Sequence, residues 1–119
     1  MIIYYNPDCS KCREAHEILE KNNCNIQIRN YLVDPPTEKE LKELIEKLGC
    51  KAIDIVRKSE PLFTERFHDK DLTDTEWLKV LSENPVLIER PIVIDGQRAI
   101  LGRPPSLVLQ LVPGQSHNS

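Results

Sequence analysis

A pair of cysteines at a strand-to-helix junction is the feature that most constrains how this chain can fold. Residues 1–5, MIIYY, are apolar, β-branched or aromatic, which favours a buried strand over a helix. Residues 6–8, NPD, end the strand, and from Cys9 onward apolar residues recur at the three- and four-residue spacing of one helix face. Cys9 therefore lies at the start of a helix that directly follows a strand, and Cys12 lies about one turn further along.

The position of Cys9 predicts a reactive thiolate. The first N–H groups of a helix lack backbone partners and carry partial positive charge, so they stabilise an anion. At such a place the first cysteine of a Cys-x-x-Cys motif can have its pKa lowered from roughly 8.5 to between about 3.5 and 7.5. Lys11 and Arg13 add positive charge nearby. We expect Cys9 to be the nucleophile and Cys12, on the apolar face of the helix, to be a less accessible thiol within disulfide reach.

Three simpler explanations of the cysteines can be weighed from the sequence. Cys24 and Cys50 stand alone, and an isolated cysteine often serves as a small buried apolar residue. Zinc usually requires a second closely spaced pair of ligands, which is absent, and the histidines form no His-x3–5-His cluster, so we expect no metal. A structural disulfide framework is disfavoured because the N-terminal segment lacks the pattern of a signal peptide. We therefore expect a cytoplasmic protein whose paired cysteines are catalytic.

Composition limits the number of domains and the classes of partner. With 119 residues, of which 39% are hydrophobic, we expect one domain over residues 1–112 and a polar, disordered tail over residues 113–119. No apolar run is long enough to span a bilayer, which argues against membrane insertion. The net charge is −3 and the basic residues are scattered, so we expect no binding to nucleic acid. We expect a monomer.

Helical signals fill the middle of the chain. Thr37 and Glu40 form a Thr-x-x-Glu capping box ahead of an apolar stripe that ends at Gly49. Thr73 and Glu76 form a second box of the same kind. The patterns predict a short strand over residues 26–31 and three helices over residues 37–48, 53–58 and 73–83.

The C-terminal part of the chain changes back to a strand pattern. Residues 91–94 and 98–101 flank an Asp-Gly pair and predict a β-hairpin, and residues 104–112 predict an amphipathic helix. The leading β-α-β unit requires parallel strands, whereas the hairpin is antiparallel. The sequence therefore predicts an α/β, thioredoxin-like fold: a mixed four-stranded sheet flanked by helices, with a helical insertion between the β-α-β unit and the hairpin.

Four segments together resemble a known family. YYNPDCSKCR, DIVRKSEP, NPVLIERPIVI and GRPPSLVL match, in order and spacing, the glutaredoxin-like arsenate reductase family and its relatives of unassigned activity, over nearly the whole chain to about Val112. The resemblance implies that Cys9, in the loop that begins with Asn6, is the nucleophile. It implies an oxyanion site of three arginines, which are Arg57, Arg90 and Arg103. It also implies no bound cofactor, with glutathione and glutaredoxin, or thioredoxin, as the reductant.

The chemistry of these arginines suits an anionic substrate. A planar guanidinium offers a fork of donors that matches two oxygens of a tetrahedral oxyanion, and its charge lets a thiolate approach a second anion. Arg90 directly precedes Pro91, and thioredoxin-like folds place a cis-proline opposite the cysteine loop. We therefore expect a cis bond at Pro91 that aims Arg90 at Cys9.

Two positions depart from the family pattern and leave other functions open. Tyr5 stands where many members have histidine, and Cys12 stands where many have serine. The first change removes a potential helper of the thiolate, and the second supplies a candidate resolving thiol. Besides an oxyanion reductase, the alternatives are a glutaredoxin-like disulfide reductase that uses Cys9 and Cys12, and a redox-sensing regulator of the Spx type, which binds RNA polymerase. Arg57 and Arg103 favour the reductase of oxyanions.

Overall fold

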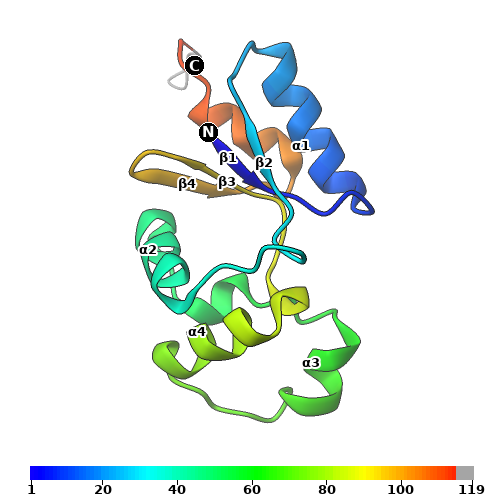
Figure 1. Cartoon of the computed structure of the whole chain (residues 1–119), viewed down its shortest axis with the longest axis vertical. Coiled ribbons are helices and arrows are strands. Elements are labelled where there is room, and N and C mark those ends of the chain that lie inside the picture. Colours follow the sequence, from blue (N-terminus) through cyan, green and yellow to red (C-terminus); the bar gives the residue numbers. More distant parts are fainter. Residues whose placement is uncertain (115–119) are drawn as a thin grey trace. The chain divides into compact units, whose positions relative to one another are not determined.

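The computed structural model describes residues 1–114 and groups the chain into two compact units (Figure 1). The first, the sheet unit, contains Met1–Tyr31 and the chain from Arg90 onward, and the second, the helical unit, contains Leu32–Glu89. The helical unit coincides with the predicted helical insertion. The single domain over residues 1–112 stays a prediction, and most of the predicted tail, residues 115–119, lies outside the described residues.

The sheet unit contains the mixed four-stranded sheet that the sequence predicts. Its strands run in the order β2-β1-β3-β4. β1 pairs with β2 in parallel and with β3 in antiparallel orientation, and β3 and β4 form the antiparallel hairpin. The elements of this unit are β1 (Ile2–Tyr4), α1 (Ser10–Lys21), β2 (Gln27–Arg29), β3 (Ile92–Asp95), β4 (Arg98–Leu101) and the 3-10 helix η3 (Pro105–Leu111). The predicted fold class is confirmed.

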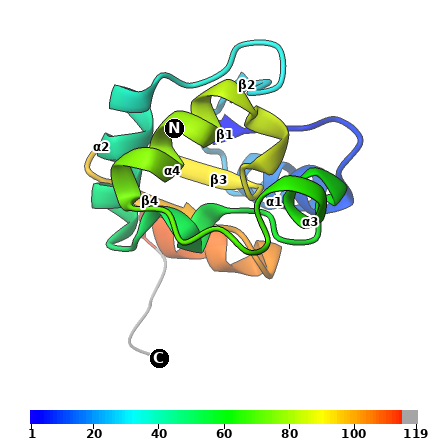
Figure 2. The same ribbon diagram turned by 90° about the horizontal axis from the view of Figure 1, so that it is seen from below.

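One apolar core fixes the helix that begins beside the cysteines. Ile3 of β1 and Val93 of β3 are register partners and are fully buried. Ala15 and Leu19 of α1 pack on them, together with residues of η3, which contacts α1 (Figures 1 and 2). Burying a large apolar side chain contributes about 1.5 to 3 kcal/mol. This packing holds α1 against the sheet and so fixes where its first turn lies.

The last predicted helix is present as a 3-10 helix. Residues 104–112 were predicted to form an amphipathic helix, and the chain forms the 3-10 helix η3 there, with hydrogen bonds such as Leu107 N to Pro104 O at 3.0 Å. In a 3-10 helix, side chains three residues apart share one face. Pro105, Val108 and Leu111 have this spacing and are all buried. The tighter helix therefore buries all three at once.

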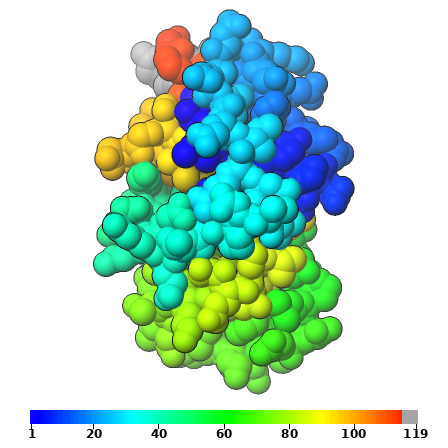
Figure 3. All heavy atoms as spheres, viewed as in Figure 1, coloured from blue at the N-terminus to red at the C-terminus, as the bar shows by residue number. Residues whose placement is uncertain are grey.

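Strand β2 forms one edge of the sheet. Its segment lies at the surface in the space-filling view (Figure 3). Ile28 in the centre of β2 is 48% exposed, whereas Tyr31, two residues after the end of the strand, is fully buried. The chain thus turns inward immediately after β2, which places the Tyr31 side chain inside the protein.

The helical unit shows both predicted capping boxes. Thr37 accepts a hydrogen bond from Glu40 N at 3.1 Å, and Thr73 accepts one from Glu76 N at 3.2 Å, while both glutamates bond back to the threonine N–H groups. Gly49 ends the first of these helices with a positive φ of 70°. The elements of this unit are α2 (Glu38–Leu48), the 3-10 helix η1 (Ala52–Ile55), α3 (Pro61–Arg66), α4 (Asp74–Glu83) and the 3-10 helix η2 (Pro85–Leu87).

The predicted helix over residues 53–58 was wrong in its extent. The helical turn is the four-residue η1, which ends at Ile55, and Val56 is extended. Val56 forms a β-bridge with Ile88, and Arg57 N donates to Leu87 O at 2.7 Å. These long-range backbone bonds replace the helical ones, so Arg57 lies just outside a helix. The sequence analysis also missed α3, although Pro61 at its first position is a helix-start signal.

Within the described part of the chain, no helix is long and apolar enough to cross a membrane. Over the same residues, no group of three or more histidine, cysteine, aspartate or glutamate side chains could hold a metal ion.

Candidate active site

The loop between β1 and α1 is shaped by hydrogen bonds of its own residues. Asn6 accepts twice: its side-chain Oδ1 from Asp8 N at 3.0 Å, and its carbonyl oxygen from Cys9 N at 3.0 Å. Arg13 returns from the helix and donates to Pro7 O at 2.7 Å. These bonds place Cys9 at the N-cap of α1 in an extended conformation, with φ −99° and ψ 117°. Asn6 and Arg13 thus hold the loop that presents the Cys9 sulfur.

Cys9 has an acidic thiol although it is only 8% exposed. Burial by itself raises the pKa, because it disfavours the charged thiolate. The Arg90 side chain opposes this by hydrogen bonding to the sulfur, and backbone and side-chain bonds from Cys12 and a backbone bond from Lys11 act in the same direction, so the pKa of Cys9 falls from 9.0 to about 7. The first turn of α1 also contains no acidic residue that would oppose the thiolate. A large fraction of Cys9 is therefore thiolate at neutral pH.

Cys12 behaves in the opposite way. Its side chain is fully buried, and this burial raises its pKa to about 12, helped by the negative charge of the neighbouring Cys9. A backbone bond from Asn6 and the charge of Arg90 only partly offset these effects. All four cysteines are free. At neutral pH the pair thus consists of a thiolate at Cys9 and a protonated thiol at Cys12.

The other two cysteines lie elsewhere and are only partly buried. Burial raises the pKa of Cys50, and the carboxylates of Asp54 and Asp74 raise it further. Cys24 contacts the apolar core of the sheet unit.

Arg90 is the cation beside Cys9. It lies two residues before β3, and its peptide bond to Pro91 is cis. Its pKa is raised: burial alone would lower it, but the hydrogen bond to Cys9 and the charges of Tyr31, Cys9 and Cys12 have the larger combined effect. Its Nε is buried and, among the described residues, has no hydrogen-bond partner. Arg90 therefore keeps its charge and has one buried donor for which the described residues supply no acceptor.

Gly102 lets the end of β4 approach Pro91 closely. Its N–H donates to Pro91 O at 2.8 Å. A Cβ at this position would lie 3.0 Å from Pro91 Cγ and 3.2 Å from Val108 Cγ1. Only glycine allows this approach without a shift of its neighbours, and the residue that follows it, Arg103, is thereby placed next to Arg90.

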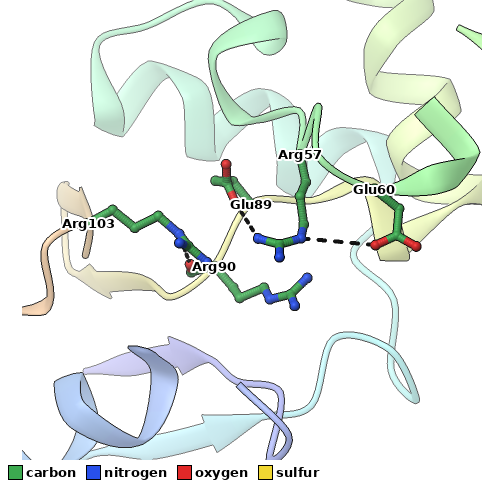
Figure 4. Close-up of polar contacts among 5 residues, drawn as sticks. All are labelled: Arg57, Glu60, Glu89, Arg90 and Arg103. Carbon is green, nitrogen blue, oxygen red and sulfur yellow. Dashed lines mark hydrogen bonds and ion pairs between the residues drawn. The ribbon is translucent and has the colours of Figure 1, made fainter. Parts of the chain in front are cut away.

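Arg103 contacts the backbone of Arg90. Its Nε donates to the carbonyl oxygen of Arg90 at 2.7 Å (Figure 4). The structure therefore brings Cys9, Arg90 and Arg103 together within the sheet unit. Sequence reasoning named Arg103 as a ligand of the substrate and missed its bond to the backbone that carries Arg90.

Arg57, the third predicted arginine, lies in the helical unit. Its Nη1 donates to Glu89 Oε1 at 3.2 Å, and its Nε lies 4.0 Å from Glu60 Oε2 (Figure 4). Two carboxylates therefore balance its charge, and the sequence analysis foresaw neither. The participation of Arg57 in a site with Cys9 stays a prediction.

Tyr31 is a further residue near the cysteines that the sequence analysis missed. It is fully buried, its ring stacks on Tyr4 with centroids 6.2 Å apart, and the charges of Arg90 and Cys9 act on its hydroxyl. A signal was present in the sequence. The ends of two parallel strands meet at one edge of a sheet, so a tyrosine just after β2 is expected beside the loop that follows β1.

Comparison with known proteins places the chain in a family. The model of the ArsC family matches residues 4–111. An arsenate reductase of Haemophilus influenzae is 40% identical over 114 residues, which cover 94% of this chain and 98% of that protein. The uncharacterized protein YfgD of Escherichia coli K12 is 37% identical, covering 92% of this chain and 94% of YfgD. The structure of an arsenate reductase from Vibrio cholerae superposes with a TM-score of 0.87 at 40% identity, covering 92% of this chain and 94% of that one. With this extent of similarity, the chain belongs to the ArsC family.

Proposed function

We propose that this protein is a thiol-dependent reductase of arsenate or a similar tetrahedral oxyanion. The observation that carries the proposal is the pairing of Cys9, a thiol with a pKa of about 7, with the Arg90 guanidinium, whose buried Nε has no partner among residues 1–114. A thiolate needs such a cation to meet an anionic substrate. The relatives from Haemophilus influenzae and Vibrio cholerae are named arsenate reductases, which agrees with this chemistry.

The first step is attack of the Cys9 thiolate on arsenic(V). A sulfur–arsenic bond forms, and one arsenic–oxygen bond breaks as that oxygen leaves as water after taking up protons. Arg90 holds the remaining oxygens and balances the charge that the thiolate brings. We propose that Arg103 supports this step by fixing the Arg90 backbone, because its Nε bonds to the Arg90 carbonyl.

A second thiol completes the reduction. It attacks the Cys9 sulfur and forms a disulfide, and the electron pair of the sulfur–arsenic bond stays on arsenic, which becomes arsenic(III) and leaves as arsenite. Two thiols thus supply the two electrons. We propose that this thiol is glutathione. The resulting disulfide at Cys9 is then reduced by glutaredoxin, or by thioredoxin instead of glutaredoxin.

A second candidate function is the reduction of disulfides with Cys9 and Cys12 as a pair. The hydrogen bond between the two cysteine side chains favours it, because this contact places Cys12 next to the sulfur it would attack. In that reaction the Cys9 thiolate attacks one sulfur of a substrate disulfide, the substrate S–S bond breaks, and the other sulfur leaves as a thiol. Cys12 then attacks the Cys9 sulfur of the mixed disulfide, which releases the second substrate thiol and leaves the Cys9–Cys12 disulfide. No oxyanion is involved, so this function needs neither Arg57 nor Arg103.

Arsenite formation from arsenate tests the main proposal. The assay supplies glutathione with glutaredoxin in one series and thioredoxin with its reductase in another. Cys9→Ser should abolish turnover, whereas Cys50→Ser, a matched change in the helical unit, should leave it within about twofold. Absence of arsenite with every reductant, together with turnover of a small disulfide, would reject the oxyanion reductase in favour of the disulfide reductase.

A further inference from the structure

Two buried donors without a partner lie in the sheet unit, and both are near Cys9. Within residues 1–114, the buried side-chain nitrogen and oxygen atoms that lack a hydrogen bond are Tyr31 Oη, Arg90 Nε and Arg57 Nε. Buried polar groups are nearly always hydrogen-bonded, so each exception calls for an explanation. The proposed oxyanion substrate would supply an acceptor for Arg90 Nε. The Tyr31 hydroxyl has no role in the chemistry described so far.

The surroundings of Tyr31 indicate what could bind its hydroxyl. Tyr31 is 0% exposed, and the charges of Arg90, Cys12 and Cys9 act on its hydroxyl. The Arg90 side chain also donates toward the hydroxyl oxygen, which leaves the O–H proton of Tyr31 to be donated elsewhere. Burial, the largest influence, raises the pKa of Tyr31 to about 12, so the phenol stays protonated and can donate at any physiological pH. The Tyr31 O–H and the Arg90 Nε–H are therefore two neighbouring donors, and the residues that the structure describes supply no acceptor for either.

We propose that Tyr31 is a substrate-binding residue, whose hydroxyl donates a hydrogen bond to an oxygen of the oxyanion that Arg90 holds at Cys9. This inference rests on the proposed function and adds a ligand to it. The guanidinium fork matches two oxygens of a tetrahedral anion, and the phenol supplies a donor for another oxygen. Because the phenol is neutral, it adds this bond without changing the charge of the site.

A purely structural role for Tyr31 makes a different prediction. Its ring stacks on Tyr4 and occupies the interior after β2, which the ring of phenylalanine would do equally well. Tyr31→Phe therefore removes the hydroxyl alone. Since the O–H proton of Tyr31 has no acceptor among residues 1–114, removal of the hydroxyl should leave the thermal unfolding temperature at or above the wild-type value.

Protection of Cys9 from alkylation measures oxyanion binding without requiring turnover. Iodoacetamide labelling is followed by mass spectrometry on the tryptic peptide of residues 1–11, which contains Cys9 and no other cysteine. Arsenate, and sulfate as a mimic that is not reduced, are the protecting anions. For Tyr31→Phe the half-protecting concentration should rise roughly 10- to 100-fold, the value of one hydrogen bond to a charged group. Tyr4→Phe, which removes the other hydroxyl of the stacked pair, should stay within about twofold of wild type.

The outcomes of this experiment separate the proposed oxyanion reductase from the role of Tyr31. Failure of both anions to protect wild-type Cys9 would overturn the proposed oxyanion reductase, and the role of Tyr31 with it. Protection of wild type and equal protection of Tyr31→Phe would overturn the Tyr31 inference alone. A lowered unfolding temperature of Tyr31→Phe would show that the Tyr31 hydroxyl stabilises the fold, and this result would also overturn the inference. An equal loss of protection in Tyr4→Phe would overturn it as well, because the loss would then not be specific to the Tyr31 hydroxyl.

Discussion

The Nε of Arg103 donates a 2.7 Å hydrogen bond to the backbone carbonyl oxygen of Arg90, so two of the predicted oxyanion ligands are linked before any substrate binds. The link joins the second residue after β4 to the second residue before β3, next to the close approach of Gly102 and Pro91. Arg90 in turn hydrogen-bonds to the Cys9 sulfur. A change at Arg103 can therefore reach the Cys9 sulfur through the position of Arg90.

Arg103→Lys should raise the pKa of Cys9 even without substrate. Lysine keeps the positive charge but lacks the Nε donor, so the backbone that carries Arg90 is held less firmly. The rate of Cys9 alkylation against pH measures the effect. Arg98→Lys is a matched control, because Arg98 also donates to a backbone carbonyl, that of Gln110, at 2.6 Å. If Arg103→Lys weakens oxyanion protection and leaves the pKa unchanged, Arg103 contacts the substrate and does not position Arg90.

Removal of the charge at Arg90 should raise the pKa of Cys9, measured by its alkylation rate against pH, more than Arg103→Lys does. The alkylation rate of wild-type Cys9 should rise with a midpoint near pH 7. In Arg90→Met the thiolate loses its cation and hydrogen bond while burial continues to disfavour it, so the midpoint should move upward, toward or above the value of an ordinary thiol. Arg66→Met, a change at an exposed arginine of α3, should have no effect. A wild-type midpoint at the ordinary thiol value would refute the assignment of Cys9 as the nucleophile.

Arg90→Lys should separate the two candidate enzymatic functions. Lysine retains charge and loses the two-pronged contact, and each hydrogen bond to a charged group contributes about 1.5 to 3 kcal/mol. The kcat/KM for arsenate should therefore fall by roughly one to two decades. Reduction of a small neutral disulfide should hardly change, since no oxyanion is held. Equal losses in the two assays, or no loss with arsenate, would favour the disulfide reductase.

Mild oxidation should join Cys9 to Cys12. The i to i+3 spacing on a helix keeps the two side chains on neighbouring faces, and they already hydrogen-bond. Trypsin cleaves after Lys11, so the disulfide would appear as residues 1–11 linked to residues 12–13 in the peptide mass spectrum. Detection of Cys9 only as a glutathione adduct, in the presence of glutathione, would instead indicate a single-thiol route in which Cys12 takes no part.

The parts of the fold that sequence could predict depend on local signals. Both capping boxes and the Asp-Gly hairpin turn are set by residues that are close together in the chain, and all are present in the structure. The end of η1 depends instead on the pairing of Val56 with Ile88, and the 3-10 form of η3 depends on which of its side chains the core accepts. Such long-range determinants leave little trace in a short sequence window.

In the candidate site, too, residues with local sequence signals were predicted and those that depend on long-range contacts were missed. The place of Cys9 at the start of a helix follows from the segment around it. Arg90 was named by the family resemblance, and its proline neighbour singled it out from the other arginines. The carboxylate partner of Arg57 at Glu89 and the buried hydroxyl of Tyr31 depend on contacts between distant segments. For Tyr31, the parallel pairing of β1 and β2 was the available signal, and it becomes informative only after the sheet order is known.

The sheet unit is assembled from both ends of the described chain, and this has a consequence for the protein during its synthesis. Cys9 leaves the ribosome well before Arg90, which lowers its pKa and lies 81 residues further along the chain. β3, which pairs with β1, is also made after the helical unit. Until that strand is in place, the nascent chain carries Cys9 as an ordinary, weakly nucleophilic thiol. The activated sulfur therefore arises only after translation has passed Arg90 and β3, and until then the growing polypeptide is spared the oxidation to which an activated thiolate is prone.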